Sequence, residues 1–325
     1  MNILVTGGSG FVGKAVVREL RRAGHEVTIL TRRPASGPVQ SGITLVRGDL
    51  TSAGAIADLI AEHGFHGICH LAGLTGIRDS FRRPTTYFDV NVGGTVNLLK
   101  AVRAGHARTG APARVVFASS RAVYARSDNA PVPETHPAIP ATPYGVTKRA
   151  VEQLLDFESQ SGVLGATTLR CFNVSGGAPG ITDSDTQRLI PRLVGAIAGK
   201  LPPATLGSPG NRRDFVHVMD VGRAFAAAIE RVEPGMCRVY NLGTGIGTSI
   251  GEIVALLEQV AGRAVPRATT FADDAPDPDA GIADISLIRR ELGWVPTMSI
   301  EALAHDAWRL MQNPPCRPLT RVTRL

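Results

Sequence analysis

Residues 1–13 read MNILVTGGSGFVG, a short apolar run followed at once by glycines at positions 7, 10 and 13. The run predicts a buried strand, and the apolar spacing from Phe11 onward predicts a helix. Gly7 permits a tight turn between them, Gly10 lets the backbone approach a pyrophosphate, and Gly13 lets the helix sit close to the strand. Such a triad can also be an ordinary strand-to-helix turn, but its place at the first strand favours a dinucleotide site.

The first half of the chain continues this alternation of strand and helix. Strands are predicted at 2–6, 26–30, 43–47, 67–71, 114–118 and 166–170. The alternation predicts an α/β fold class, a doubly wound parallel sheet of the Rossmann type with helices on both faces. After residue 170 the sequence is rich in Gly and Pro, with helical stretches near 187–198 and 249–261, which predicts a smaller, irregular α/β substrate lobe.

These patterns also predict a division of the chain. We expect residues 1–172 to form the dinucleotide-binding domain, with a returning segment near 214–245. Residues 173–213 and 246–312 are expected to form the substrate lobe, and residues 313–325 a tail.

Length and composition exclude several classes of protein. The chain has 325 residues, of which 43% are hydrophobic, enough to bury a sizeable core. No apolar run approaches the ~20 residues of a membrane span and the start lacks a signal peptide, so a cytoplasmic protein without a membrane partner is expected. The four cysteines form no CxxC pair and no His/Cys cluster has zinc spacing, so no metal is expected. The net charge of +7 comes mostly from scattered arginines without interleaved aromatics, which argues against a nucleic-acid partner.

The end of the second predicted strand bears on which dinucleotide binds. There Thr31, Arg32 and Arg33 offer no carboxylate to bond a ribose 2′-hydroxyl or to repel a 2′-phosphate. Because an arginine can pair with that phosphate, the sequence favours NADP over NAD, with a solvated arginine pair as the alternative. Asp49, after the third strand, is placed to bond the adenine amino group.

Tyr144 and Lys148 lie one turn apart on a predicted helix that Thr142 caps and Pro143 begins. A nearby ammonium and an oxidised nicotinamide favour the phenolate form that a tyrosine needs to act as a base. Two serines at 119–120 end the preceding strand, where one hydroxyl can bond a reacting oxygen. A solvated helix pair and a strand-end cap are the structural alternatives.

Further motifs accompany these residues. They are HLAG at 70–73, Tyr87 followed by NVGGT at 91–95, SS at 119–120 followed by VY at 123–124, LRCFN at 169–173, RDFVHV at 213–218 followed by DV at 220–221, YNLG at 240–243 and ELGW at 291–294. With them the chain resembles the extended short-chain dehydrogenase/reductase family over nearly its whole length. The resemblance is strongest to its NAD(P)-dependent nucleotide-sugar epimerase/dehydratase group, of the UDP-glucose 4-epimerase type.

The resemblance implies a role for each matching residue. Tyr144 is the expected acid/base, Lys148 its electrostatic partner and a nicotinamide-ribose ligand, and Ser120 the partner of the sugar oxygen. Expected cofactor-binding residues are Gly7, Gly10, Phe11, Val12, Gly13, Arg32, Asp49, Leu50, Leu71, Ala72, Gly73, Asn91, Tyr144 and Lys148, and expected substrate-binding residues are Thr75, Ser120, Asn173 and Arg213.

Three of these assignments go further. Asn91 is expected to support the lysine through water, and Asn173 and Arg213 to hold the nucleotide diphosphate. Asn173 could instead bracket a loop, and Arg213 could form a surface pair with Asp214.

The chain departs from the family pattern in three places. Residues 121–122 are Arg and Ala where the sugar 4,6-dehydratases carry acidic residues, which argues against a dehydratase. Thr75 stands where many epimerases have lysine. Asp274 stands where a second diphosphate arginine is expected, a loss for which Arg267 or Arg78 could compensate.

The predicted function is therefore a nucleotide-sugar 4-epimerase. Tyr144 removes the O4 proton, hydride passes to the nicotinamide, and the 4-keto sugar turns over before hydride returns to its opposite face. The alternative is an NADP-dependent reductase or dehydrogenase of a keto nucleotide sugar, which Arg32 and Arg33 favour. A cofactor-binding regulator without turnover is a remote alternative, because it has no need of the tyrosine, lysine and serine together.

A homodimer is the expected assembly. Residues 89–104 and 144–160 carry Val and Leu at helical spacing. In the family, the corresponding helices often pair with their copies in a four-helix bundle, and two-fold contacts are the commonest assembly.

Overall fold

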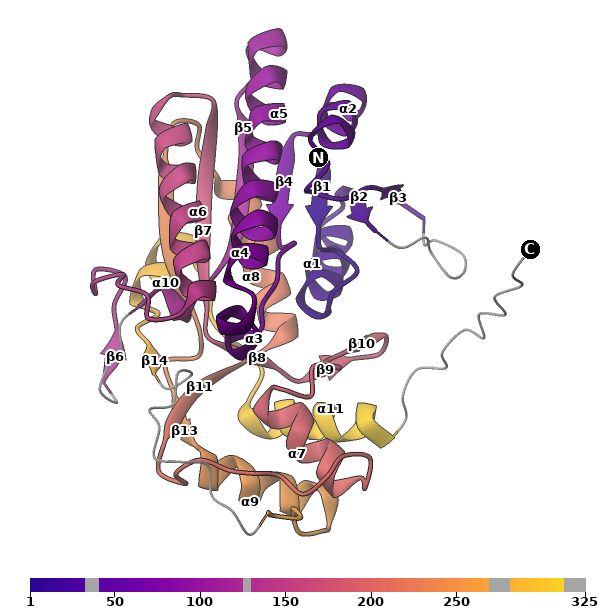
Figure 1. Ribbon diagram of the computed structural model, residues 1–325, viewed down its shortest axis with the longest axis vertical. Coiled ribbons are helices and arrows are strands. Elements are labelled where there is room, and N and C mark those ends of the chain that lie inside the picture. The colour runs from indigo at the N-terminus through magenta and orange to yellow at the C-terminus, as the bar shows by residue number, and fades with distance from the viewer. Residues whose placement is uncertain (33–40, 125–129, 269–280, 313–325) are drawn as a thin grey trace, which may run out of the picture.

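The computed structural model describes residues 1–32, 41–124, 130–268 and 281–312. A sheet flanked by helices fills the upper part of the molecule in Figure 1, and a smaller lobe lies below the carboxyl ends of its strands. Arg33, Asp274, Cys316 and the expected tail at 313–325 fall outside the described residues.

Seven parallel strands form the sheet, in the order β12-β7-β5-β4-β1-β2-β3. Their bounds are β1 Asn2–Thr6, β2 Glu26–Thr31, β3 Ile43–Arg47, β4 Gly67–His70, β5 Ala113–Ser120, β7 Leu164–Cys171 and β12 Cys237–Leu242. The chain runs outward from β1 to β3 and then returns to place β4 on the other side of β1, a topological switch point at which α/β sheets bind ligands. The predicted doubly wound parallel sheet is confirmed, and its seventh strand comes from the segment that returns after residue 214.

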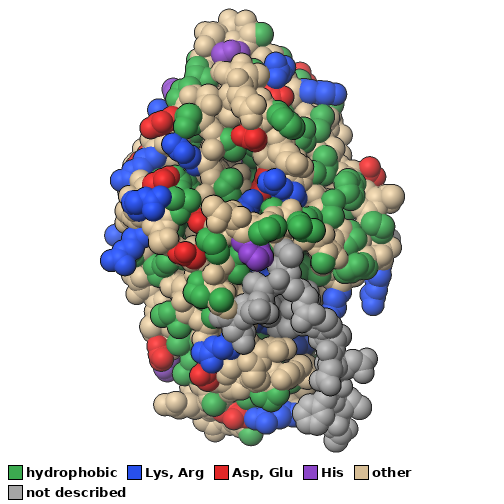
Figure 2. Space-filling model, turned by 90° about the vertical axis from the view of Figure 1, so that its left-hand side faces the viewer, with side chains coloured by type: hydrophobic (Ala, Val, Ile, Leu, Met, Phe, Trp, Pro, Cys, Tyr) green, Lys and Arg blue, Asp and Glu red, His purple; other side chains and the backbone are tan. Residues whose placement is uncertain are grey.

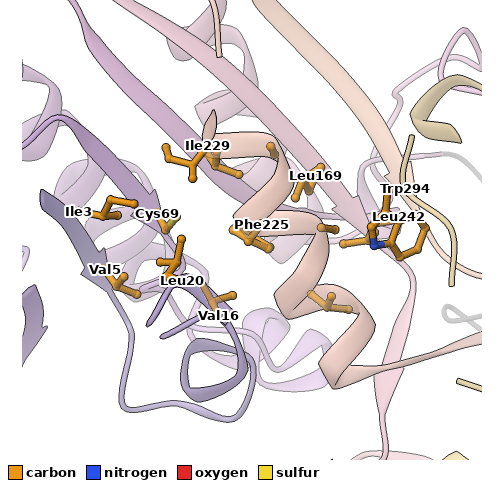
Figure 3. Close-up of a cluster of buried hydrophobic side chains, with 14 of the residues drawn as sticks. Ile3, Val5, Val16, Leu20, Cys69, Leu169, Phe225, Ile229, Leu242 and Trp294 are labelled. Carbon is orange, nitrogen blue, oxygen red and sulfur yellow. The ribbon is translucent and has the colours of Figure 1, made fainter. Parts of the chain in front are cut away.

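Helices cover both faces of the sheet. On one face lie α1 Phe11–Arg22 and α8 Val218–Arg231, and on the other lie α2 Ala53–His63, α5 Gly94–Thr109 and α6 Pro143–Gln160. Figure 3 shows the core under the first pair, where Ile3 and Val5 of the sheet face Leu20 of α1 and Phe225 of α8. The two helices touch through backbone, because a Cβ at Gly222 would lie 2.7 Å from the carbonyl oxygen of Ala15.

The smaller lobe has its own short sheet and core. Strands β8 Asn173–Ser175, β11 Arg212–His217 and β13 Gly247–Ser249 pair in the order β13-β11-β8. Helices α7 Leu189–Ile197, α9 Ile250–Ala261 and α11 Ile300–Gln312 pack together below them. The remaining short pairs are β9 Gly177–Ala178 with β10 Ile181–Thr182 and β6 Pro131–Val132 with β14 Ile282–Ala283, and α10 is Ser286–Leu292. Strand β11 crosses the expected boundary at residue 213, since it pairs within the lobe and then leads directly into α8.

The stretch 89–104, expected as one helix, is divided. Helices α3 Ile77–Arg82 and α4 Pro84–Tyr87 lead into a π-helical segment at Phe88–Gly93, and α5 begins only at Gly94. Single π-helical turns often occur at functional sites, and this one contains Asn91. The apolar spacing therefore predicted the helix but not the change in its hydrogen bonding.

Candidate active site

A cavity of about 870 Å³ lies where the strand ends of the sheet meet the lobe. Every expected site residue except Asn91 lines it: Gly7, Gly10, Phe11, Val12, Gly13, Arg32, Asp49, Leu50, Leu71, Ala72, Gly73, Thr75, Ser120, Tyr144, Lys148, Asn173 and Arg213. One end of the cavity is thus formed by the β1–α1 turn, and the other by β8, α7 and β11 of the lobe.

The β1–α1 turn brings backbone to the cavity. Gly7 has φ 74°, and a Cβ at Gly13 would lie 2.1 Å from the Gly7 carbonyl oxygen, so both positions require glycine. The first turn of α1 receives no side-chain cap from Gly10. Its unpaired amides can therefore hold an anion such as a pyrophosphate.

Ser120, Tyr144 and Lys148 meet at the middle of the cavity. The Thr142 side chain accepts a hydrogen bond from the Gly145 amide at 3.0 Å and Pro143 begins α6, which confirms the expected start of this helix. The Ser120 hydroxyl lies close enough to the Tyr144 phenol to lower its pKa. The Lys148 ammonium donates to the Ala118 carbonyl at 2.8 Å and lies 5.8 Å from the centre of the Tyr144 ring.

Burial dominates the electrostatics of this trio. Tyr144 is 7% exposed, and burial raises its pKa to about 12, against the Ser120 hydrogen bond and the charge of Arg188, which lower it. Lys148 is 3% exposed, and burial lowers its pKa to about 8, against Cys171 and Glu152, which raise it. The lysine is still mostly protonated at neutral pH, and the tyrosine is a neutral phenol in the chain alone.

Asn91 lies behind the cavity wall. Its Oδ1 accepts from the Leu74 amide at 2.7 Å, and its Nδ2 donates to the Leu74 carbonyl at 3.1 Å and to Thr147 Oγ1 at 3.0 Å. A Cβ at Gly73 would lie 2.9 Å from Asn91 Oδ1 and 3.8 Å from Lys148 Nζ. Asn91 therefore fixes the loop at Leu74 against the turn of α6 that precedes Lys148.

A buried ion pair lies beneath the trio, and sequence reasoning missed it. The Glu152 carboxylate accepts from Ser119 Oγ at 2.5 Å and from Arg170 at 3.0 and 2.8 Å. Arg170 also donates to Tyr124 Oη at 2.9 Å. The sequence did carry one sign of this ion pair, because Glu152 lies four residues after Lys148 and so on the same face of the helix.

At the end of β2, Arg32 is exposed and Thr31 is buried. The Asp49 carboxylate accepts from the Thr51 amide at 2.9 Å and from its hydroxyl at 2.8 Å. These bonds lower the pKa of Asp49, and the charge of Arg32 lowers it further, so Arg32 and Asp49 lie close together at this end of the cavity.

The lobe end of the cavity is lined by arginines. Arg213 on β11 and Asn173 on the paired β8 are there as expected. Arg78 and Arg192 lie close to Arg213, and of these two the sequence analysis had singled out only Arg78. Arg188 also lines the cavity, with its guanidinium 6.0 Å from the centre of the Phe11 ring.

Asp214 and Arg267 both have hydrogen-bond partners away from the cavity. The carboxylate of Asp214 accepts from Thr244, Gly245 and Ala283, at distances of 2.6 to 3.1 Å, so its hydrogen bonds go to the loop after β12 and to β14. Arg267 donates to Glu258 Oε1 at 3.3 Å and does not line the cavity, whereas Arg78 does. Arg78, and not Arg267, is therefore placed to meet a ligand in the cavity.

Within the described ranges, no three His, Cys, Asp or Glu side chains are grouped to hold a metal ion, and no helix is long and apolar enough to cross a membrane. Cys69, Cys171 and Cys237 are free thiols. On the face drawn in Figure 2, Lys and Arg side chains are interspersed with Asp and Glu.

Comparison with known proteins agrees with this geometry. The model of the NAD-dependent epimerase/dehydratase family matches residues 3–243. The chain belongs to this family. The resemblance read from the sequence motifs is thereby confirmed.

Relatives match over almost the whole chain. The UDP-glucose 4-epimerase of Streptomyces lividans is 31% identical over 323 residues, covering 96% of this chain and 96% of that protein. The structure of the Stenotrophomonas maltophila UDP-glucose 4-epimerase with bound NAD and formylated UDP-arabinopyranose is 32% identical, with a TM-score of 0.84 over 96% of this chain and 98% of that one. The Bifidobacterium longum enzyme in complex with NAD+ and UDP is 28% identical, with a TM-score of 0.86 over 97% and 99%.

Proposed function

We propose that the protein is a nucleotide-sugar 4-epimerase that works through a bound nicotinamide dinucleotide and a 4-keto intermediate. The observation that carries this is the position of Ser120, Tyr144 and Lys148 between the glycine turn and the arginine end of one cavity. A cofactor held at one end and a sugar nucleotide held at the other then meet at these three side chains. Because the solved relatives hold UDP or a UDP sugar, we propose a uridine diphosphate sugar as substrate.

The cavity residues fit a dinucleotide. Glycines at 7 and 13 let the turn pack closely on the backbone of Ala72 and of Gly7 itself, and the uncapped start of α1 offers amides to the pyrophosphate. Lys148 would bond the nicotinamide ribose, and Arg32 and Asp49 would meet the adenosine, since all three line the cavity. When bound, the nicotinamide accepts and returns a hydride and adds a positive charge beside Tyr144.

Each residue of the trio then has a defined task. Tyr144 takes the proton of the sugar 4-hydroxyl as the hydride leaves C4 and gives it back at the end. Ser120 bonds the same oxygen and lowers the pKa of Tyr144. Lys148 holds its charge near the tyrosine ring at 5.8 Å, which favours the phenolate once the cofactor is in place.

A reductase is the second candidate, because the end of β2 carries Arg32 and no carboxylate. NADP preference would follow from a bond between this arginine and a 2′-phosphate. The reductase would use the same trio but would release its cofactor after every turnover.

Two measurements on freshly purified protein test the proposal. UDP-glucose and UDP-galactose are supplied separately without added cofactor, and the sugars are separated by chromatography, while the denatured protein is assayed for released NAD and NADP. An epimerase interconverts the two sugars with its cofactor retained. Oxidation of either sugar that stops without a stoichiometric supply of NADP+ would favour the dehydrogenase, and no conversion of either UDP hexose would reject the epimerase.

The assembly and location stay proposals. Phe157 and Val146 on α6 are exposed, the former at 65%, and Phe88 beside α5 is 40% exposed. We propose that a copy of the chain covers this face in a homodimer, which light scattering at micromolar concentration tests; a monomer there would contradict it. A cytoplasmic location agrees with the substrate class.

A further inference from the structure

Arg192 occupies an unusual position on α7. The other residues of this helix are apolar and buried, and they pack into the core of the lobe. Arg192 lines the cavity beside Leu189, Ile190 and Pro191, and it is the charged side chain of this helix. Its Nε is buried and has no hydrogen-bond partner among the described residues. A buried donor without a partner is costly, and the guanidinium that carries it belongs to a side chain in the wall of the cavity.

The neighbour of Arg192 on the helix gives a contrast. Arg188, one turn earlier, pairs with Asp183 at 3.3 Å and with Asp185 at 3.5 Å. The acids near the start of α7 are thus already engaged with Arg188. Arg192 has no ion pair with an acid in the part of the chain that the structure describes.

Other arginines gather around Arg192. Burial lowers its pKa, and the charges of Arg78 and Arg213 lower it further, so three guanidinium groups lie within electrostatic reach of one another. They come from three separate elements, α3, α7 and β11. An anion bound among these groups would be attracted by all three charges.

We propose that Arg192 is a ligand of the substrate's diphosphate and forms, with Arg213 and Arg78, the clamp that holds it. This inference rests on the proposed function for the class of substrate. Each phosphoryl group of a diphosphate is anionic and offers several acceptors, which the planar guanidinium fork matches. The family's second diphosphate arginine is replaced by Asp274, and the clamp takes the missing cation from α7 instead.

The test compares ligands that carry the diphosphate, UDP and pyrophosphate, with uridine, which lacks it. Titration calorimetry measures UDP, uridine and inorganic pyrophosphate on the NAD-saturated protein and on its Arg192→Gln variant. We expect the variant to bind UDP about ten- to a hundred-fold more weakly and to lose pyrophosphate affinity, because it loses a charge-assisted bond. Uridine affinity should change by less than about twofold, because uridine never reaches the clamp.

Two further variants keep the test decisive. Arg267→Gln removes the other candidate cation, and we expect unchanged UDP affinity because Arg267 bonds Glu258 outside the cavity lining. Arg192→Lys keeps a charge but not the fork, so we expect an intermediate UDP affinity; it also serves if Arg192→Gln does not fold, as judged by NAD affinity and melting temperature.

The outcomes separate this inference from the proposed function. Unchanged UDP and pyrophosphate affinity in the Arg192 variants would overturn the clamp, as would an equal loss for UDP and uridine. Absence of sugar epimerisation by the parent protein would reject the epimerase, while diphosphate-dependent binding through Arg192 would still stand.

Discussion

The cavity has a glycine end and an arginine end, and the two ends are built to hold anions in opposite ways. At the β1–α1 turn, Gly7 and Gly13 expose backbone, and the uncapped amides of α1 face the ligand. At the lobe, Arg192 and Arg213 extend long side chains from α7 and β11. A backbone site is therefore broken by adding atoms, whereas a side-chain site is broken by removing them.

The largest effect is expected between the ends, at Tyr144. Tyr144→Phe removes the proton-transfer group but keeps the ring, so we expect turnover to fall ~10²- to 10⁴-fold while NAD and UDP affinities stay near those of the parent. Steady-state kinetics and calorimetry measure both. Near-normal turnover in this variant would remove Tyr144 from the mechanism.

At the glycine end, a single methyl group should be enough to break the site. In Gly13→Ala the new Cβ would lie 2.1 Å from the Gly7 carbonyl oxygen and 2.7 Å from Gly8 Cα, so the turn must shift. We expect NAD affinity to fall about a hundredfold and UDP affinity to fall much less.

Gly54 provides the matched control for this change. It lies in α2 with no atom within 4 Å of an added Cβ, so Gly54→Ala should leave NAD affinity unchanged. Equal NAD binding by Gly13→Ala and the parent would show that the turn does not need its close packing.

The outer rim of the glycine end tests whether side chains also contribute there. Replacing Thr31 with Asp and Arg32 with Asn supplies a carboxylate for the ribose and removes the phosphate partner, so the preference should move towards NAD by about tenfold. Dissociation constants for NAD and NADP measure the ratio, and Arg32→Asn alone separates the two contributions. An unchanged ratio would mean that Arg32 does not touch the cofactor, and the reductase would lose its support.

The last prediction concerns the stability of the protein and Lys148, a buried cation that donates to the Ala118 carbonyl, whereas Arg188 pairs with two carboxylates. Its pKa falls from 10.5 to about 8 on folding, so between these values the unfolded chain binds more protons and stability rises with pH. Below about pH 8 the charged lysine destabilises the empty protein by up to roughly 3 kcal/mol. Lys148→Met should therefore raise the melting temperature by a few degrees at pH 7 and by less at pH 9.5.

Lys100 gives the comparison for that experiment. It is exposed on α5, so Lys100→Met should not reproduce the pH-dependent gain. A Lys148→Met protein that melts at or below the parent temperature at pH 7 would contradict the prediction.

The glycine end could be predicted from the sequence and most of the arginine end could not. Residues 7 to 13 are contiguous, and their geometry follows from the turn that the glycines allow. Arg192 sits in an apolar helical stretch, and only the packing of α7 against the rest of the lobe shows that it faces the cavity rather than solvent. Hydrophobic periodicity predicts which residues share a face of a helix, but not whether the polar face packs against a cavity or is exposed to solvent.

The trio shows the same limit. The spacing of Tyr144 and Lys148 and the cap at Thr142 are local, so the helix was predicted correctly. Glu152 lies on α6 and was missed because its partner Arg170 lies on β7, and its role follows only from burial. The expected ammonium next to the phenol is present, but burial outweighs it in the empty chain, and no pattern in the sequence measures desolvation.

The close packing of α1 against α8 also decides when the amino-terminal half of the protein can fold. Helix α1, which begins the cofactor site, shares a core with Phe225 and Ile229, and β12 completes the sheet beside β7. A chain still on the ribosome and ending at residue 172 has neither, so it exposes the apolar faces of α1 and the sheet to water. The first residues synthesised must wait for α8 and β12 before their core is complete, so we expect the amino-terminal half to be a poor choice for separate expression.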